Sequence, residues 1–239
     1  LERLGIRLKS PGTLVAVDTE TTGLDPIGDT LVGISLSPAP GEAYYLPLGH
    51  DRGINLSVSD LQRILGPILA DGQIPKCGHH LKFDTAFLES VGLQVEGIAF
   101  DTLVAAQMLE PERESRKLDE LTVAHLKRAM TSIEDLIGAG KQQKSMASVE
   151  IEKVSHYACE DADATRQLVD YYRPLIDREE FARLYYDIEL PLIRVLQQME
   201  RTGVWVDSEE LARQSKELAE QIGGVEKKIY GMAGREFNL

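Results

Sequence analysis

The stretch LVAVDTETTGL (residues 14–24) decides the fold. Its first four residues form an apolar run typical of a buried strand. Two carboxylates, Asp18 and Glu20, follow where the apolar run ends. Because residues i and i+2 of a strand share a face, both acids are expected on the side of Leu14 and Ala16. A solvated strand end also carries acids, so the pair alone leaves a surface terminus and a functional site as equal alternatives.

Composition describes a globular protein of one or two domains. The 239 residues are 43% hydrophobic and 27% charged, with 26 basic and 39 acidic residues and a net charge of −13. This charge argues against a protein that coats nucleic acid through a basic face. It leaves open an enzyme that meets phosphates through metal ions, because bound cations reverse the local field.

Several features predict a cytoplasmic protein without a membrane segment. No apolar run approaches the roughly 18 residues of a membrane span, and the first residues lack a secretory signal. Cys77 and Cys159 are too few for a disulfide framework, so we expect two small buried hydrophobes in a reducing compartment.

The start without methionine and the abrupt close on GREFNL predict a piece of a larger protein.

The first half of the chain reads as α/β. Two β-rich runs, at 29–37 and 42–48, follow the first strand with short links and predict an antiparallel meander. A helix over 56–72, capped by Ser57 or Ser59, and a fourth strand at 74–78 come next. A helix over 81–92 follows, and from Asp101 the chain is mostly helical. Two C-terminal helices end the chain, the second with Asp207 and Glu210 as a capping-box-like start.

A third acid lies in the middle of an apolar helix stripe. Asp161 belongs to a helix face formed by Val154, Ala158, Asp161, Thr165, Leu168 and Tyr172. Neither Glu160 nor Asp163 lies on that face. A buried, unpaired carboxylate would cost several kcal/mol, so Asp161 requires a cation, a hydrogen-bond network or a proton. Tyr157, one turn earlier, can place its hydroxyl beside it.

Asp84 is a weaker candidate, because an acid in the first turn of a helix is ordinary. It borders the apolar line of Phe83 and Phe87. Carboxylates from a strand and two helices can converge on hard cations such as Mg²⁺ or Mn²⁺, which prefer oxygen ligands. Two such ions about 4 Å apart activate a water and stabilise a leaving phosphodiester oxygen.

Three segments resemble the exonuclease motifs of the DnaQ-like superfamily. VAVDTETTGL matches D-x-E, GHHLKFD matches N-x-x-x-[YF]-D, and YACEDAD matches Y-x-x-x-D of the tyrosine subgroup. Over essentially the whole chain the sequence resembles the 3′→5′ proofreading domain of the bacterial DNA polymerase I family. The resemblance implies an RNase H-like fold, a mixed five-stranded sheet flanked by helices with a C-terminal helical segment. It divides the chain into an exonuclease domain (residues 1–186) and the first helices of a truncated polymerase domain (residues 187–239).

The resemblance also implies roles for individual residues. Two divalent ions, Mg²⁺ or Mn²⁺, would be held by Asp18, Glu20, Asp84 and Asp161, with Asp18 shared. Tyr157 would orient the attacking water. Thr21 and Leu24 match positions near the terminal nucleotide, where wedging against a base tolerates any sequence.

The second motif departs from the family, because His80 replaces its Asn. His80 can contact substrate with a pH-dependent charge, or with His79 recruit a transition metal, the weaker alternative. Lys82 is either a phosphate contact or a solvated lysine. The loop around Lys141 and Lys144 is expected to be plain surface.

The sequence thus favours a metal-dependent 3′→5′ DNA exonuclease acting on single-stranded or frayed 3′ ends. Its expected partner is a covalently attached polymerase domain, in a monomer. The alternatives are a catalytically weakened scaffold domain and a ribonuclease D-like RNA exonuclease. All four carboxylates are present, which disfavours the scaffold, and the polymerase-like C-terminal segment disfavours the RNA enzyme.

Overall fold

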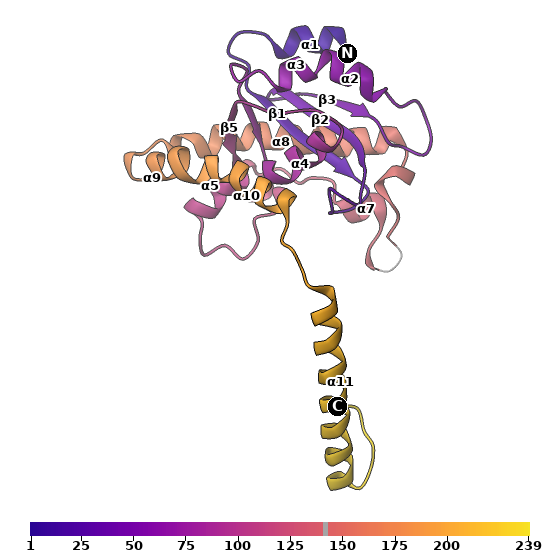
Figure 1. The fold of residues 1–239 in the computed structure, drawn as a ribbon. Coiled ribbons are helices and arrows are strands. Elements are labelled where there is room, and N and C mark those ends of the chain that lie inside the picture. The colour runs from indigo at the N-terminus through magenta and orange to yellow at the C-terminus, as the bar shows by residue number, and fades with distance from the viewer. Residues whose placement is uncertain (141–142) are drawn as a thin grey trace. The chain divides into compact units, whose positions relative to one another are not determined.

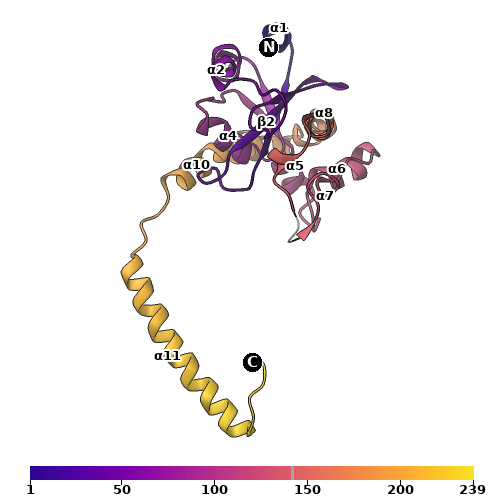
Figure 2. The same cartoon turned by 90° about the vertical axis from the view of Figure 1, so that its right-hand side faces the viewer.

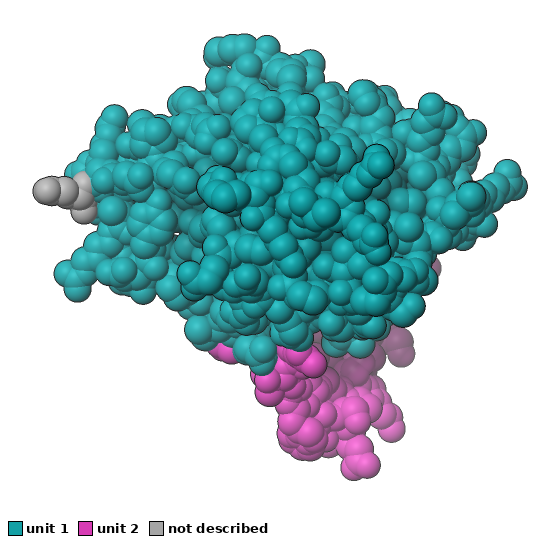
Figure 3. All heavy atoms as spheres, turned by 90° about the horizontal axis from the view of Figure 1, so that it is seen from above, with its two compact units in different colours: residues 1–198 teal, residues 199–239 magenta. Residues whose placement is uncertain are grey.

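The computed structural model describes residues 1–140 and 143–239 of the chain. It divides into two compact units, residues 1–198 and residues 199–239, which Figure 3 draws in different colours. Each is described here by itself.

The first unit is built on a mixed sheet of five strands in the order β3-β2-β1-β4-β5. The antiparallel meander predicted for the first three strands is confirmed, and β4 and β5 extend the sheet in parallel from β1. The five-stranded mixed sheet implied by the resemblance is therefore confirmed. The strands are β1 (Val15–Thr21), β2 (Leu31–Ala39), β3 (Glu42–Pro47), β4 (Lys76–Gly78) and β5 (Ile98–Asp101).

Helices cover both faces of this sheet, and Figure 2 shows α4 and α8 on opposite sides of it. The helices of the first half are α1 (Glu2–Leu8), α2 (Val58–Ile64), α3 (Gly66–Leu69), α4 (Leu81–Ser90), α5 (Thr102–Leu109) and α6 (Leu118–Leu121), the last continued by a π-helical turn (Thr122–Leu126). Those that follow are α7 (Ile133–Ile137), a 3₁₀ turn (Met146–Ser148), α8 (Ile151–Ile176), α9 (Glu179–Leu184), a π-helical turn (Tyr185–Glu189) and α10 (Leu190–Thr202).

Strand β1 divides the apolar side chains between two cores, as its period of two requires. Val15 and Val17 pack with apolar residues of α1 to α4 on one face. Leu14 and Ala16 pack with residues of α5, α8 and α10 on the other. The predicted division of this strand into two faces is confirmed, so Asp18 and Glu20 continue the α8 face of the sheet.

Three local predictions differ from the structure. The helix expected over residues 56–72 is two helices, because Pro67 occupies the first turn of α3 and ends the hydrogen-bond ladder of α2. Strand β5 and helix α1 have no counterpart in the prediction, since both are short and lack a clear period. Cys77 is fully buried as expected, whereas Cys159 is only partly buried. The predicted caps Ser57 and Asp207 are confirmed.

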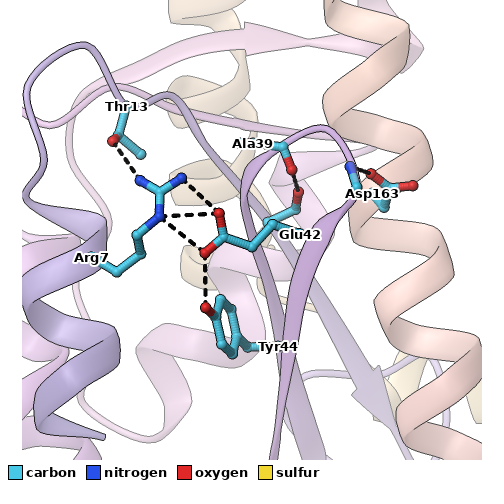
Figure 4. A network of polar contacts seen from close by, with 8 residues as sticks. Arg7, Thr13, Ala39, Glu42, Tyr44 and Asp163 are labelled. Atoms are coloured by element: carbon cyan, nitrogen blue, oxygen red, sulfur yellow. Dashed lines mark hydrogen bonds and ion pairs between the residues drawn. The ribbon is translucent and has the colours of Figure 1, made fainter.

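Polar contacts fix the β2–β3 hairpin from both sides (Figure 4). The Arg7 guanidinium of α1 donates to both carboxylate oxygens of Glu42, at 2.7 to 3.1 Å. At the turn, Gly41 has φ +79° and its N–H donates to Asp163 of α8 at 2.6 Å. The hairpin is thereby tied to the helix that carries the candidate site.

One buried carboxylate caps two helices. Asp101, 1% exposed at the end of β5, accepts the N–H groups of Leu103 and Val104 at 2.9 and 3.1 Å at the start of α5. It also accepts those of His80 and Leu81 at 3.3 and 2.7 Å at the start of α4. A helix start leaves such donors without intrahelical partners, so Asp101 sets where both helices begin.

Replacing Asp101 with alanine is expected to destabilise the protein by about 2–4 kcal/mol, because two helix caps are lost and buried N–H groups remain unsatisfied. Urea unfolding followed by circular dichroism measures the loss. The Asp101→Asn variant, which keeps one acceptor oxygen, should fall between the two. A midpoint for the alanine variant equal to that of the wild type would contradict this role.

The second unit consists of the end of α10, a short linker and α11 (Ser208–Ala233). Figure 1 shows α11 as one continuous helix. Asp207 caps it by accepting the N–H groups of Glu209 and Glu210 at 3.1 and 3.0 Å. No helix in the described part of the chain is long and apolar enough to cross a membrane.

Candidate active site

Three carboxylates meet where the apolar part of β1 ends. Oxygens of Asp18, Glu20 and Asp161 all lie within 4.8 Å of one another. Glu20 is 6% exposed and Asp161 is 9% exposed. The Ser35 hydroxyl, from the paired position on β2, donates to Oδ2 of Asp18 at 3.1 Å. The strand pair and the helix stripe predicted separately therefore supply one cluster.

Helix α8 delivers Asp161 in the way its apolar stripe predicts. The other stripe residues are fully buried, and the Tyr157 hydroxyl donates a hydrogen bond to the Asp161 carboxylate. The acids beside it in sequence point elsewhere. Glu160 accepts the N–H of Thr131 at 2.8 Å, and Asp163 accepts from Arg128 at 2.8 Å. Those two acids hold neighbouring segments in place.

Asp84 approaches the cluster from the other face of the sheet. It lies in the first turn of α4, is 3% exposed, and accepts the Thr19 hydroxyl at 2.7 Å. It is not one of the three acids that lie within 4.8 Å of one another. Among neighbouring charges, that of Asp18 nevertheless raises the pKa of Asp84 the most. Of the three clustered acids, Asp18 is thus the one whose charge acts on Asp84.

The electrostatics of this group demand a proton or a cation. Burial raises the pKa of Asp18 to about 7. Burial, followed by the charge of Asp18, raises the pKa values of Glu20, Asp84 and Asp161 well above their usual range. No described lysine or arginine forms an ion pair with any of the four.

Hard divalent cations fit this donor set. The ligands are carboxylate oxygens only, which suit Mg²⁺ or Mn²⁺ rather than a thiophilic metal. A cation would also relieve the mutual repulsion that otherwise keeps protons on these acids. A bound cation would therefore supply the charge compensation that the described part of the protein does not itself provide.

A cavity of about 610 Å³ opens over the carboxylates. One wall is the end of β1 and the turn after it, where Leu24 is 84% exposed. Another part of the lining comes from α7 and the segment that follows it, with Ile133, Ile137, Lys144 and neighbouring residues. A cleft with acids on its floor and apolar side chains on its rims can hold an extended ligand.

The substrate-contact residues predicted from the sequence fall into two groups. Thr21 and Leu24 line the cavity, and the Thr21 hydroxyl donates to the carbonyl of Gly23 at 2.6 Å. His80 and Lys82 are not among the described residues that line it. His80 is exposed and has a left-handed backbone with φ 78°. Its ring stacks on that of Phe83, with the ring centroids 6.1 Å apart. Histidine and asparagine are both enriched in that backbone region, which explains how one can replace the other.

The histidine pair shows no sign of a transition-metal site. Nδ1 of His79 lies 2.9 Å from the Thr102 hydroxyl, and Nε2 lies 3.1 Å from the carbonyl of Arg116. Burial lowers the pKa of His79, so the ring is a neutral structural link. Both ring nitrogens are occupied, and His80 faces solvent.

The part of the cavity lining that follows α7 was not predicted from the sequence. Lys144 is exposed, as predicted, but it lines the cavity instead of lying on plain surface. Lys141, the other lysine of that loop, lies outside the described residues. Nothing in the loop sequence signals this position, because it depends on where α7 packs against α8.

Replacing Lys144 with alanine is expected to weaken binding of an anionic substrate and raise its KM by about 3–10-fold, with little change in kcat, because the lysine adds positive charge at the rim. Steady-state cleavage of an oligonucleotide at two salt concentrations measures both constants. Lys153→Ala, on the exposed start of α8, is the matched control. Equal effects of the two variants would assign the change to net charge alone.

Comparison with known families identifies the family to which the chain belongs. The 3′-5′ exonuclease family of family A DNA polymerases matches residues 4–177. This match covers most of the chain, and the chain belongs to that family. Its fold class and its class of enzyme, a 3′-5′ exonuclease, follow from this membership.

Particular relatives narrow the comparison to DNA polymerase I. The chain is 39% identical to DNA polymerase I of Chloroflexus aurantiacus, over 94% of this chain and 24% of the relative. It is 36% identical to DNA polymerase I of Pseudomonas aeruginosa, over 95% of this chain and 25% of the relative. The chain thus spans about a quarter of the length of these relatives.

Two solved structures share the fold of this chain. The POL domain of Pol1 from M. smegmatis, in complex with DNA primer-template and dNTP, superposes with a TM-score of 0.74 at 24% identity, covering 99% of this chain and 36% of that one. Brucella melitensis NrnC with bound Mg²⁺ superposes with a TM-score of 0.62 at 21% identity, covering 82% of this chain and 89% of that one.

Proposed function

We propose that the chain is the proofreading module of a DNA polymerase I and removes nucleotides from the 3′ end of DNA by a two-metal-ion mechanism. The observation that carries the proposal is the cluster of Asp18, Glu20 and Asp161, of which Glu20 and Asp161 are buried and Asp18 is partly buried, without an ion-pairing lysine or arginine among the described residues. Asp84, next to Asp18, supplies a fourth carboxylate. Two Mg²⁺ or Mn²⁺ ions bound there would supply the Lewis acidity that phosphodiester hydrolysis needs.

The four carboxylates divide between two cation positions in this proposal. Asp18 lies within 4.8 Å of Glu20 and Asp161 and is the clustered acid whose charge acts on Asp84, so it is the acid suited to be shared. Family membership supports the requirement for divalent metal. The number of ions and the choice between Mg²⁺ and Mn²⁺ belong to the proposal.

Tyr157 is suited to orient a water molecule by hydrogen bonding. Burial, with the nearby charge of Asp161, raises the pKa of the Tyr157 phenol above its usual range. The phenol therefore keeps its proton at physiological pH and can donate a hydrogen bond, but it does not act as a base. Its bond to Asp161 places the hydroxyl at the edge of the carboxylate cluster.

The substrate proposed is a single-stranded or frayed 3′ terminus. Leu24 and Ile133, which both line the cavity, offer apolar contact to bases without reading their edges. Thr21 is suited to contact the terminal nucleotide. His80 and Lys82 are kept as contacts for the strand outside the cavity, because each lies at the start of α4.

The assignment of residues 187–239 to the start of a polymerase domain stays a prediction. The similarity to full-length DNA polymerases I over almost the whole chain supports it. Leu190 and Ile193 of α10 pack in the core of the first unit. The monomeric state and the cytoplasmic location also stay predictions.

Degradation of labelled DNA tests the function. A 5′-labelled single-stranded oligonucleotide with Mg²⁺ should yield a ladder that shortens by one nucleotide at a time, whereas replacing its last phosphodiester with a phosphorothioate should slow the reaction. Chelation by EDTA should stop it. An RNA oligonucleotide of the same sequence distinguishes the ribonuclease alternative, and faster cleavage of RNA than of DNA would contradict the proposal.

A further inference from the structure

Thr19 lies between Asp18 and Glu20 in the sequence and binds Asp84, the acid outside the cluster. Its hydroxyl donates a 2.7 Å hydrogen bond to Oδ1 of Asp84. Its backbone N–H donates to the same carboxylate. Thr19 is 8% exposed and Asp84 is 3% exposed, so water does not compete for these bonds. One residue therefore binds Asp84 through both its main chain and its side chain.

The topology explains why Thr19 has this partner. Strand β4 pairs with β1 only at Val15 and Ala16, and it ends at Gly78. Helix α4 begins immediately afterwards and brings Asp84 alongside β1, beyond the end of β4. The carboxylate of Asp84 thus accepts the N–H of Thr19, which has no carbonyl of β4 beside it. The alternation of the strand turns the Thr19 side chain toward α4, away from Asp18 and Glu20.

Asp84 needs such an anchor more than the other acids do. The three clustered acids lie within 4.8 Å of one another. Asp84 lies outside that group, on a separate helix, and Thr19 is its hydrogen-bond donor among the described residues. Hydrogen bonds from outer partners orient carboxylates that ligate metals, and their loss typically costs 10–100-fold in metal affinity.

We propose that Thr19 is a positioning residue of the exonuclease site, which fixes the Asp84 carboxylate so that its free lone pairs face the cation position shared with Asp18. This inference rests on the proposed two-metal function. The middle residue of the D-x-E motif then has a chemical requirement of its own: a hydroxyl on the face opposite the two acids.

Binding of Mn²⁺ to the whole chain, followed by the EPR signal of the free ion, tests this role without relying on activity. The wild type should bind two ions. Thr19→Val, which keeps the branched shape and removes the hydroxyl, should weaken one of the two by about 10-fold or more and leave the other unchanged. Thr19→Ser, which keeps the hydroxyl, should stay within about threefold of the wild type.

Thr122→Val is the matched control. The Thr122 hydroxyl is buried and donates to the carbonyl of Leu118 at 2.7 Å, so its removal costs a buried hydrogen bond away from the carboxylates. It should lower the melting temperature as Thr19→Val does and leave both Mn²⁺ affinities unchanged. The concentration of Mg²⁺ that gives half-maximal cleavage should rise for Thr19→Val alone, while KM for DNA stays constant.

Two results would overturn the role of Thr19: unchanged Mn²⁺ binding in Thr19→Val, or equal losses in Thr19→Val and Thr19→Ser. If Thr19→Val does not fold, Thr19→Ala takes its place with the same expectation. Failure of the wild type to bind Mn²⁺ would instead overturn the proposed function. The two failures are therefore distinguishable.

Discussion

Replacing Asp18 with asparagine is expected to lower the rate of 3′-terminal cleavage by on the order of 10³-fold or more, because the acid placed to serve both cation positions is lost. The same change should raise the free energy of unfolding in EDTA at pH 8 by about 1–3 kcal/mol, since it removes a carboxylate whose charged form is disfavoured at this site. Opposite signs for activity and stability are typical of a functional site. Cleavage assays and urea unfolding of one preparation measure both.

Asp170→Asn is the control for this variant. Asp170 is an exposed acid of α8 that pairs with Arg166 at 2.8 Å, away from the cluster. It should leave cleavage unchanged and alter stability by at most about 0.5 kcal/mol. A fall in the stability of Asp18→Asn in EDTA would show that Asp18 is a structural acid and would remove it from the site.

Divalent cations are expected to stabilise the protein strongly above neutral pH and weakly under acidic conditions. The folded-state pKa of Asp18, about 7, lies above its unfolded value. Its contribution to stability is therefore fully present below the unfolded pKa and is lost as pH rises through about 7. The pKa values of Glu20, Asp84 and Asp161 are raised in the same direction, so these acids add to the same loss of stability as pH rises.

Binding of Mg²⁺ or Mn²⁺ replaces those protons and cancels the loss. At about 100-fold excess over its Kd a cation adds about 2.7 kcal/mol, or roughly 5–10 °C in melting temperature for a chain of this size. Thermal unfolding at pH 5 and pH 8, with the cation or with EDTA at matched ionic strength, measures the difference. A larger shift at pH 5 than at pH 8 would contradict the assignment of the carboxylates as cation ligands.

The sequence predicts well those parts of the site that depend on a period within one element. The two-residue alternation of β1 places Asp18 and Glu20 on one face, and the stripe on α8 places Asp161 inward with Tyr157 beside it. Each of these patterns is local and needs no knowledge of the other elements. The prediction that this strand and this helix meet in space came from the resemblance to a known family.

Features that arise only from packing could not be predicted from such patterns. Asp101 caps α4 from a distance of twenty residues in sequence, and Lys144 reaches the cavity through the placement of α7. In the sequence, Thr19 resembles any other strand residue, because its role depends on the packing of α4 beside β1. Short elements such as β5 offer too few residues for a period to appear.

Anomalous diffraction from crystals soaked in MnCl₂ tests most directly whether β1, α4 and α8 together form a metal centre. We predict two manganese peaks beside the Asp18 carboxylate, one also contacting Glu20 and Asp161 and the other on the side of Asp84. A map without a peak at Asp18, in crystals where Mn²⁺ binds elsewhere on the chain, would contradict it.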